Sequence, residues 1–191
     1  MNFKGKTILV TGAASGIGQA CAAAFAAAGG SVILTDINEE AGEAAAKALS
    51  GARFMKLDVT ERFECEALAA QVEKEAGGLD VLVNAAGWDI IQPFMDNTPE
   101  YWAKIVAINF MGPVQLTRAM LPLLMAAQGG GRIVNVASDA GRVGSYGESV
   151  YAGAKGGIIA FTKSLAREVV RKGVRVNCIC PGPTDTPLFA S

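Results

Sequence analysis

The stretch Thr7-Ile8-Leu9-Val10-Thr11-Gly12-Ala13-Ala14-Ser15-Gly16-Ile17-Gly18 decides the fold. It begins with a short apolar run typical of a buried strand, continues through glycines at positions 12, 16 and 18, and leads into an alanine-rich helical stretch. Because glycine lacks Cβ, the backbone can turn tightly there and approach a pyrophosphate at the amino end of the next helix. A glycine trio alone is a weak indicator, but its place between a strand and a helix is the context that a dinucleotide site needs.

The alternation of strand and helix continues along the chain. We expect strands at 7–10, 31–34, 54–57, 81–83, 132–136 and 174–179, and helices at 17–28, 39–49, 61–76, 99–127 and 150–171. Strands that are apolar on both faces and separated by helices predict a doubly wound, Rossmann-type α/β fold. We expect one parallel sheet in the order 3-2-1-4-5-6, with ligands at the carboxyl ends of the strands.

Asp36 ends the second expected strand, 18 residues after Gly18. A carboxylate there accepts hydrogen bonds from ribose hydroxyls and repels the 2′-phosphate of NADP. Two unit charges 4 Å apart interact by about 4 kcal/mol at an effective dielectric constant near 20. No Lys or Arg at 13–17 or 37 offsets that repulsion, so the sequence favours NAD over NADP. The alternative interpretation is a glycine-rich turn with a solvated aspartate.

Tyr151 and Lys155 are four residues apart on an expected helix, so their side chains share one face. We expect the Lys155 ammonium to lower the pKa of Tyr151 by roughly 1–3 units from its usual value near 10. Tyr151 would then donate and accept a proton near neutral pH. This spacing is common on solvated helix faces, but the upstream glycine loop and Ser138 give the pair a redox role.

The 191 residues contain no linker-like stretch, so we expect one domain spanning 1–191. The chain is 51% hydrophobic and carries 17 basic and 18 acidic residues, a balance that disfavours nucleic acid as a partner. It shows neither a signal-peptide apolar region nor an 18-residue apolar span. We therefore expect a cytoplasmic protein that does not contact the membrane.

The chain has no histidine, which excludes Ser-His-Asp hydrolysis, Cys-His catalysis and His-ligated zinc. Its cysteines, Cys21, Cys65, Cys178 and Cys180, lack metal-finger spacing, so we expect no metal site. We interpret all four as reduced structural thiols, with Cys178 and Cys180 pointing the same way from a strand into the core.

The chain resembles the classical short-chain dehydrogenase/reductase family over nearly its whole length. The resemblance rests on Thr11-Gly12-x-x-x-Gly16-x-Gly18, Asn84-Ala85-Ala86-Gly87, Asn109, Ser138, Tyr151-x-x-x-Lys155 and Pro181-Gly182. It implies four catalytic residues: Ser138 hydrogen-bonds the substrate oxygen, Tyr151 exchanges its proton, Lys155 holds the nicotinamide ribose and tunes Tyr151, and Asn109 anchors a water relay.

The same resemblance implies a set of residues that contact NAD. Asp58 and Val59 would flank the adenine, residues 84–87 would brace the cofactor, and residues 181–186 would bind the carboxamide. The implied set is Gly12, Ser15, Gly16, Ile17, Gly18, Asp36, Ile37, Asp58, Val59, Asn84, Ala85, Ala86, Gly87, Tyr151, Lys155, Pro181, Gly182, Thr184 and Thr186. Simpler interpretations remain: Ser138 as a turn residue, Asn109 as a helix irregularity near Pro113, and Asp58 as a helix cap.

A finer resemblance concerns residues 87–89, 138–145 and 181–187, which are similar to those of bacterial 2-hydroxycyclohexanecarboxyl-CoA dehydrogenases. It implies that Trp88 walls an alicyclic ring and that Arg142 reaches an anionic acyl carrier. The alternatives are loop packing for Trp88 and a surface ion pair for Arg142. Family members usually run several tens of residues further, so the resemblance implies that 1–191 lacks a substrate lid and a seventh strand. The chain is then either a piece of a longer protein or a lid-less form.

These observations together predict an NAD-dependent oxidoreductase that interconverts a secondary alcohol and a ketone, with a cyclic 2-hydroxyacyl-CoA as a candidate substrate. The expected partners are this small molecule and further copies of the chain in a homodimer or homotetramer. One alternative is a 3-oxoacyl-carrier-protein reductase, which usually takes NADPH and is therefore disfavoured by Asp36. The other is a non-catalytic dinucleotide-binding scaffold, which the intact Ser138, Tyr151 and Lys155 disfavour.

Overall fold

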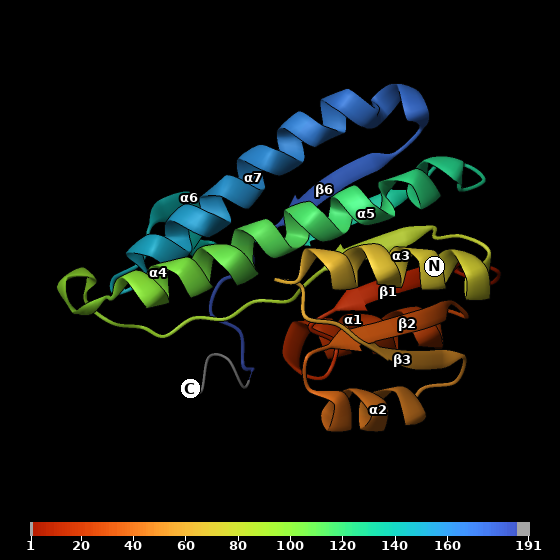
Figure 1. Ribbon diagram of the computed structural model, residues 1–191, viewed down its shortest axis with the longest axis horizontal. Coiled ribbons are helices and arrows are strands. Elements are labelled where there is room, and N and C mark those ends of the chain that lie inside the picture. Colours follow the sequence, from red (N-terminus) through yellow and green to blue (C-terminus); the bar gives the residue numbers. More distant parts are fainter. Residues whose placement is uncertain (1, 187–191) are drawn as a thin grey trace.

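Six parallel strands form the centre of the molecule in a computed structural model that describes residues 2–186 (Figure 1). Their order is β3-β2-β1-β4-β5-β6, which confirms the predicted fold class and strand order. Every neighbouring pair is parallel. The strands are β1 (Thr7–Thr11), β2 (Ser31–Asp36), β3 (Ala52–Lys56), β4 (Val81–Asn84), β5 (Arg132–Val136) and β6 (Arg175–Ile179).

Helices connect the strands, as parallel pairing requires. The α-helices are α1 (Gly16–Ala27), α2 (Glu39–Lys47), α3 (Arg62–Ala76), α4 (Pro99–Val106), α5 (Gly112–Ala126), α6 (Ala140–Val143) and α7 (Ser149–Val169). Three short segments complete the described elements: the 3₁₀ turns η1 (Phe94–Asp96) and η3 (Val170–Lys172), and a π-helical turn, η2 (Ala107–Met111).

Alternate residues of each strand point to opposite faces of the sheet, and each face builds its own apolar core. On one face, Leu9 and Leu82 pack with residues of α3, α5 and α7, including Leu116. On the other face, Ile8 and Val10 pack with alanines of α1 and α2. Burial on both faces explains why the strands read as continuous apolar runs rather than as an alternating pattern.

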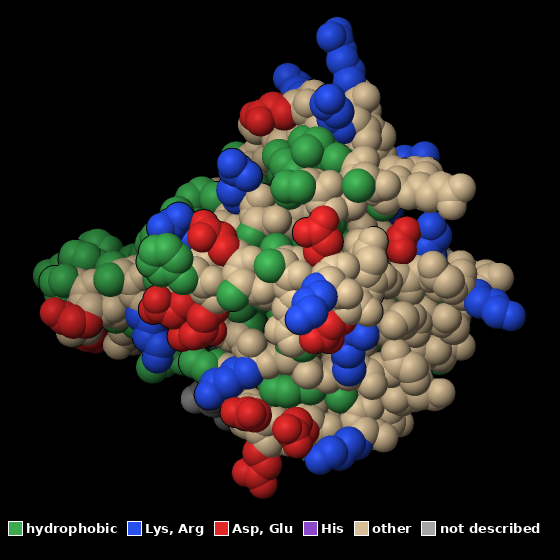
Figure 2. Space-filling model, turned by 45° about the vertical axis from the view of Figure 1, so that its right-hand side comes forward, with side chains coloured by type: hydrophobic (Ala, Val, Ile, Leu, Met, Phe, Trp, Pro, Cys, Tyr) green, Lys and Arg blue, Asp and Glu red, His purple; other side chains and the backbone are tan. Residues whose placement is uncertain are grey.

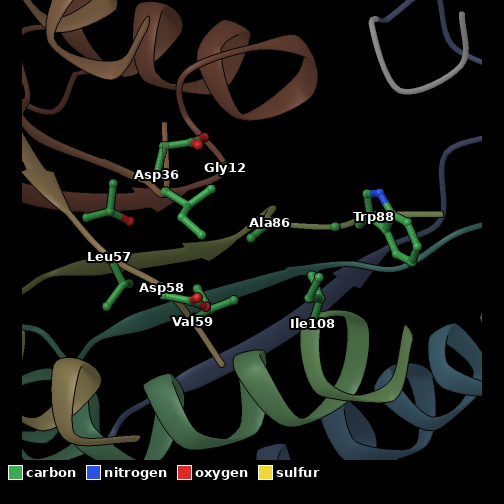
Figure 3. Close-up of a pocket in the computed structure, with 11 residues that line it drawn as sticks. Gly12, Asp36, Leu57, Asp58, Val59, Ala86, Trp88 and Ile108 are labelled. Carbon is green, nitrogen blue, oxygen red and sulfur yellow. The ribbon is translucent and has the colours of Figure 1, made fainter. Parts of the chain in front are cut away.

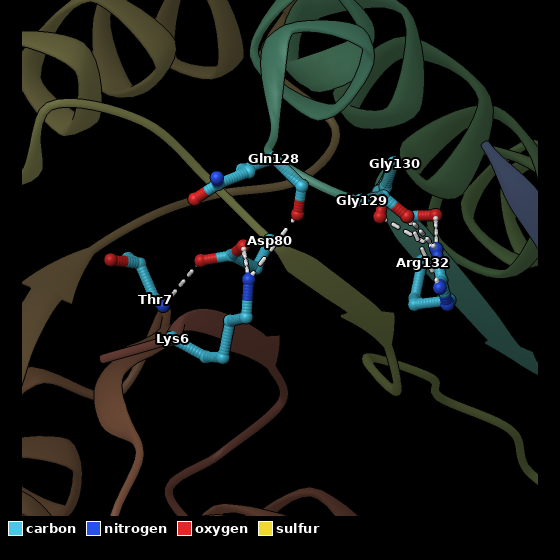
Figure 4. A network of polar contacts seen from close by, with 8 residues as sticks. Lys6, Thr7, Asp80, Gln128, Gly129, Gly130 and Arg132 are labelled. Atoms are coloured by element: carbon cyan, nitrogen blue, oxygen red, sulfur yellow. Dashed lines mark hydrogen bonds and ion pairs between the residues drawn. The ribbon is translucent and has the colours of Figure 1, made fainter. Parts of the chain in front are cut away.

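The amino-terminal edge of the sheet is held by a network of polar contacts (Figure 4). Lys6 Nζ lies 2.8 Å from Asp80 Oδ1, and the Thr7 amide donates to Asp80 Oδ2 at 2.9 Å. Beside them, the Arg132 guanidinium donates to the carbonyl oxygens of Gly130 at 2.6 Å and Gly131 at 2.9 Å. Lys6 Nζ also donates to the Gln128 carbonyl oxygen at 3.4 Å, so Lys6 joins the segments that precede β1, β4 and β5.

The expectation of one continuous helix over 99–127 is wrong. The structure divides this stretch into α4, the π-helical turn η2 and α5. Within the turn, Asn109 Nδ2 donates to the Ile105 carbonyl oxygen at 3.1 Å, so a side chain occupies a backbone acceptor. Gly112 follows the turn and packs so closely that a Cβ there would lie 2.8 Å from Val59 Cγ2. These local contacts leave no trace in apolar periodicity.

The other helix and strand boundaries shift by a few residues. The helix expected to reach residue 171 ends as α-helix at Val169, and its last turn is the 3₁₀ segment η3, closed by Gly173 at φ +77°. The third strand begins at Ala52 and ends at Lys56, because the hydrogen-bonded register with β2 extends two residues before the apolar run. Among residues 2–186, no helix is long and apolar enough to cross a membrane.

The cysteines match their predicted roles only in part. All four are free thiols, and Cys65 is fully buried. Cys178 and Cys180 are partly exposed and line a surface cavity, so the prediction that they point into the core is wrong. Cys178 shares its face of β6 with the buried Val176, but this end of the face borders the cavity beside α7, so both thiols stay partly exposed.

Candidate active site

The glycine loop between β1 and α1 takes a shape that side chains would prevent. Gly12 has φ +63°, a left-handed conformation that favours glycine, and a Cβ there would lie 2.8 Å from the Ala86 Cα. A Cβ on Gly18 would collide with the Gly12 carbonyl oxygen. The glycines therefore let α1 and the segment after β4 approach the same loop, as the sequence predicted for a dinucleotide cradle.

The amino end of α1 is available to an anion. Ser15 is the N-cap residue, and its side chain makes no capping hydrogen bond. The first amides of any α-helix lack intrahelical acceptors and carry the positive end of the helix dipole. Asp36 lies beside this loop at the end of β2, where its carboxylate accepts from the amides of Ala14 at 3.1 Å and Asn38 at 3.0 Å. Free amides next to a fixed carboxylate fit a nicotinamide dinucleotide.

A cavity of about 150 Å³ opens at the carboxyl ends of the central strands (Figure 3). It brings together seven of the residues implied to contact the cofactor, from four separate segments: Gly12, Asp36, Ile37, Asp58, Val59, Ala86 and Gly87. Leu57 and Ile108 complete the apolar part of its lining. Sequence reasoning missed these two, because an apolar residue at a cavity has the same signature as one in the core.

Thr11 and Asn84 fix the backbone that lines this cavity. Thr11 Oγ1 accepts from the amides of Ala85 and Ala86, both at 3.0 Å. The Asn84 amide nitrogen donates to Thr117 Oγ1 at 3.0 Å and to Asn135 Oδ1 at 2.8 Å. Asn84 is thus a buried support for residues 85–87, behind the cavity wall rather than on its surface.

Tyr151 and Lys155 lie on α7 and are both buried. Lys155 Nζ is 5.5 Å from the centre of the Tyr151 ring and donates to the Val136 carbonyl oxygen at 3.0 Å. A Cβ on Gly87 would lie 3.4 Å from that same Nζ. The Tyr151 and Lys155 pair therefore meets the glycine-containing segment after β4, and the catalytic and cofactor groups form one continuous region.

The pKa of Tyr151 differs from the expectation. Burial raises it to about 12, and the charges of Asp89 and Glu148 raise it too, whereas a hydrogen bond with Ser138 lowers it. Burial also lowers the pKa of Lys155 to about 8. The prediction that Lys155 lowers the Tyr151 pKa is therefore wrong for the protein alone, because removal from water penalises both charged forms. Tyr151 is a neutral hydroxyl in this state.

Asn109 is fully buried in the η2 turn and clamps the segment that follows β4. Its Oδ1 accepts from the Trp88 amide at 3.2 Å, and its Nδ2 donates to the Trp88 carbonyl oxygen at 2.7 Å. The helix-irregularity interpretation and the site interpretation therefore coincide, because the irregular turn is what directs Asn109 toward Trp88.

Ser138 follows β5, and its hydrogen bond with Tyr151 opposes the rise that burial causes in the Tyr151 pKa. Its Oγ also accepts from the Ala140 amide at 3.2 Å, so it contributes to the turn as well. The next residue, Asp139, donates its amide to the Pro181 carbonyl oxygen at 2.8 Å. This bond joins the start of the segment 181–186 to the loop after β5. The residues of that segment implied to contact the cofactor do not line the cavity of Figure 3: Pro181, Gly182, Thr184 and Thr186.

The remaining alternatives are resolved by contacts. Trp88 lines the cavity, and its ring also packs against Tyr101 with centroids 5.9 Å apart. Arg142 forms an exposed ion pair with Asp139 at 3.1 Å, as the surface interpretation predicted. Asp58 binds Thr60, at 2.9 Å to its amide and 2.7 Å to its hydroxyl, and it does not cap α3, whose N-cap is Glu61.

Comparison with known proteins agrees with this geometry. The family model described as short chain dehydrogenase matches residues 6–191. Galactitol 2-dehydrogenase of Agrobacterium fabrum is 39% identical over 97% of this chain and 73% of its own length. The 3-oxoacyl-(acyl-carrier-protein) reductase of Escherichia coli is 38% identical over 98% and 77%. D-beta-hydroxybutyrate dehydrogenase of Cupriavidus necator is 42% identical over 97% and 73%.

Proposed function

This chain belongs to the short-chain dehydrogenase family and is an oxidoreductase acting on CH–OH groups, and on that premise we propose that it uses NAD to interconvert a secondary alcohol and a ketone. One observation carries the proposal. The group of Ser138 with the buried Tyr151 and Lys155 adjoins the segment 85–87, which also borders the glycine loop. Proton exchange and dinucleotide binding would thus occur at neighbouring points.

Each polar residue has a role suited to its surroundings. Tyr151, neutral in the protein alone, donates its proton to a carbonyl oxygen during reduction and accepts one during oxidation. Ser138 places a second hydroxyl beside the same oxygen. The bound NAD supplies the hydride acceptor for oxidation. Lys155 brings a positive charge close to Tyr151, and this charge offsets part of the cost that burial places on the phenolate.

The preference for NAD rests on Asp36. Its carboxylate is fixed by two backbone amides and lines the cavity, so it can accept from ribose hydroxyls without reorganising. A 2′-phosphate there would face a negative charge, and position 37 is an isoleucine that offers no compensating cation. This argument ranks a 3-oxoacyl-carrier-protein reductase below an NAD-dependent dehydrogenase, although a reductase of that name is among the relatives.

For the substrate, we propose a cyclic 2-hydroxyacyl-CoA, with unassigned sugar alcohols as the competing class. Trp88 supports the first, because it follows Gly87, which lies near Lys155, and its backbone is held by Asn109. The relative named galactitol 2-dehydrogenase supports the second. Arg142 gives less support to a CoA carrier than expected, because its guanidinium already pairs with Asp139.

We also propose a homo-oligomer in the cytoplasm, either a dimer or a tetramer. Hydrophobic side chains gather on the projecting end of the molecule on the left of Figure 2. The segment that leads into α4 supplies several strongly exposed ones: Ile90, Ile91, Phe94 and Met95. An exposed apolar group of this size marks an interaction surface more often than a solvated one.

A substrate panel tests this proposal. Simple cyclohexanols, sugar alcohols, linear 3-hydroxyacyl-CoAs and cyclic 2-hydroxyacyl-CoAs are each incubated with NAD and with NADP, and reduced cofactor is measured by absorbance. We expect NAD-dependent oxidation with the highest kcat/KM for the cyclic thioester, because remote binding energy assists the reacting centre. A free alcohol that matches the thioester would remove the CoA assignment, and no turnover with any alcohol would favour the scaffold alternative.

A further inference from the structure

We propose that Gln115, which lies on α5 and outside the cavity lining, is a positioning residue for the base of the dinucleotide. It fixes Val59 so that the segment after β3 accepts adenine and rejects hypoxanthine, the base in which an oxygen replaces the 6-amino group. This inference rests on the proposed function, because it needs a dinucleotide in the cavity. Position 115 lies outside every motif that carries the family resemblance.

Asp58 and Val59 both line the cavity, and between them they have one free donor and one free acceptor (Figure 3). The Val59 amide makes no hydrogen bond within residues 2–186. Asp58 Oδ1 accepts from the Thr60 amide at 2.9 Å and from the Thr60 hydroxyl at 2.7 Å. Asp58 Oδ2 has no donor in the described part of the chain and stays accessible to water. A ligand can therefore bond to a donor and an acceptor on adjacent residues.

Gln115 holds the backbone of Val59 from the neighbouring helix. Its Nε2 donates to the Val59 carbonyl oxygen at 2.6 Å, between residues 56 positions apart in the sequence. One turn earlier on α5, Gly112 packs so closely that a Cβ there would lie 3.3 Å from the same carbonyl oxygen. Residues three apart on a helix share a face, so Gly112 and Gln115 together dock α5 on Val59. Because a carbonyl oxygen only accepts, the amide nitrogen of Gln115 must face it.

The peptide planes on both sides of the Val59 Cα are fixed in this way. The Glu61 amide donates to the Asp58 carbonyl oxygen at 3.1 Å and so holds the plane that contains the Val59 amide. The next plane is held at the Val59 carbonyl oxygen, by Gln115 and by the buried Cys65, whose Sγ lies 3.8 Å away. Burial raises the pKa of the Cys65 thiol to about 11, so the thiol keeps its proton. A thiol is a weak donor, so Gln115 supplies the stronger bond.

The free groups of Asp58 and Val59 match the pairing edge of adenine. The 6-amino group of adenine donates and the adjacent N1 accepts, so the base can bond to Asp58 Oδ2 and to the Val59 amide together. Hypoxanthine would place an oxygen against the carboxylate and an N–H against the amide. A site whose polar groups an analogue leaves unpaired discriminates strongly against that analogue. Without Gln115 the Val59 peptide can rotate, and this discrimination falls.

The test compares NADH with its hypoxanthine counterpart, two dinucleotides that carry the same phosphates. Each is titrated into the unmutated protein, Gln115→Met, Gln115→Glu, Gln115→Lys and Gln71→Met, and the fluorescence of the reduced nicotinamide is recorded. Methionine and an ionised glutamate are close to glutamine in size but cannot donate, whereas lysine restores a donor. Gln71 is an exposed glutamine of α3 that bonds to Glu75 at 3.0 Å, so its variant controls for the loss of a glutamine side chain.

We expect NADH to bind the unmutated protein and Gln71→Met at least about tenfold tighter than the hypoxanthine dinucleotide. In Gln115→Met and Gln115→Glu the ratio should fall to about threefold or less, because the Val59 amide is no longer held. Gln115→Lys should restore most of the ratio, which a role in packing alone would not do. An unchanged ratio in both variants that lack the donor, or equal affinities in the unmutated protein, would overturn the inference.

Turnover separates this inference from the proposed function. With an alcohol that the protein oxidises, Gln115→Met should raise KM for NAD at least about fivefold and leave kcat within about twofold, because Gln115 bonds to Val59 and to neither Tyr151 nor Lys155. A fall in kcat at unchanged KM would overturn the inference. If no alcohol is oxidised while the base preference and its loss in Gln115→Met are both measured, the proposed function alone is contradicted.

Discussion

The edge of the sheet at the amino ends of the strands and the edge at their carboxyl ends differ in how their polar groups are hydrogen-bonded. At the amino-terminal edge, Lys6 and Asp80 form an ion pair, Asp80 accepts from the Thr7 amide, and Arg132 donates to nearby backbone carbonyls (Figure 4). At the carboxyl-terminal edge, the helix cap Ser15 makes no capping bond with its side chain, beside the cavity of Figure 3. The contacts of Lys6, Asp80 and Arg132 are made within the protein, whereas the amino end of α1 at the other edge is open to a ligand.

The polar groups that stabilise the fold and those that serve the chemistry therefore lie at opposite ends of the strands. A group that is satisfied within the fold lowers the free energy of the native state, but it has nothing left to offer a substrate. Groups left unsatisfied cost stability and gain function, as is expected for binding sites at the carboxyl ends of parallel strands. Substitutions at the two edges should therefore affect different measurements.

The largest effect should come from Tyr151→Phe at the open edge. Loss of the hydroxyl removes proton exchange, so turnover should fall at least about a hundredfold, the lower end of what acid–base catalysis contributes. NAD affinity and the urea midpoint should stay close to those of the unmutated protein, because the ring remains in the core. Steady-state rates and fluorescence titration measure this. A Tyr151→Phe variant that keeps most of its activity would contradict the assignment of proton exchange to Tyr151.

Lys155→Met should show how much the buried charge of Lys155 lowers the free energy of unfolding. Burial lowers the Lys155 pKa from 10.5 to about 8, so the unfolded chain holds this proton more tightly. The contribution of Lys155 to the free energy of unfolding, measured as the difference between the unmutated protein and Lys155→Met, should therefore rise by about 2 kcal/mol as pH increases from about 8 toward 10. The raised pKa of the Cys65 thiol, about 11, lowers the stability of both proteins in this range and cancels in the difference. In Lys155→Met this gain should be absent. Tyr151 acts only above this window, since its raised pKa makes stability fall from pH 10 toward 12.

Urea unfolding at pH 8 and pH 10 measures the Lys155 effect. Lys163→Met, on the exposed face of the same helix, is the matched control and should keep the rise with pH. An equal change in the free energy of unfolding between pH 8 and pH 10 in Lys155→Met and the unmutated protein would show that burial of the Lys155 charge does not lower stability.

Asp36→Ala should narrow the preference for NAD. We expect NAD to bind the unmutated protein at least tenfold tighter than NADP, a difference of about 1.4 kcal/mol, and the variant to lose most of that gap. Glu39→Ala removes a nearby exposed carboxylate and should leave the gap intact. Fluorescence titration with both cofactors gives the ratio, and equal affinities in the unmutated protein would refute the assignment of Asp36.

Asp80→Asn at the closed edge should have the smallest effect and only on stability. The variant weakens a part-buried ion pair with Lys6 and a bond to the Thr7 amide, at a cost of about 1 kcal/mol. Turnover should not change. Glu43→Gln, which loosens the exposed pair with Lys47, should change neither quantity. A drop in turnover that exceeds the stability loss would mean that the two edges are coupled.

Much of this organisation could be predicted from local sequence. The glycines at 12 and 18, Asp36, and the spacing of Tyr151 and Lys155 each require a residue type that is visible in the chain itself. The strand order follows from the alternation of apolar runs and helices. These features depend on near neighbours or on a repeated pattern.

The rest depended on contacts between distant segments. The raised pKa of Tyr151 comes from burial, which spacing on a helix does not reveal. The η2 turn arises where Asn109 turns toward Trp88, 21 residues earlier. The loop before α4 and the loop before α7 meet through the Gln92 amide, which donates to the Gly147 carbonyl oxygen at 3.0 Å. Sequence alone gave no signal for that meeting.

The buried, hydrogen-bonded amide and hydroxyl side chains behind the cavity also help to select the register in which the strands pair during folding. Asn84 donates to Asn135, and Asn135 donates to Thr162 at 2.8 Å, so β4, β5 and α7 are joined through side chains in the dry interior. A slip of one residue in the pairing of β5 would turn Asn135 to the opposite face of the sheet. Each partner left without a bond would then cost about 1–3 kcal/mol. Apolar strands can pair in several registers. The hydrogen bonds of Asn84, Asn135 and Thr162 favour the native register.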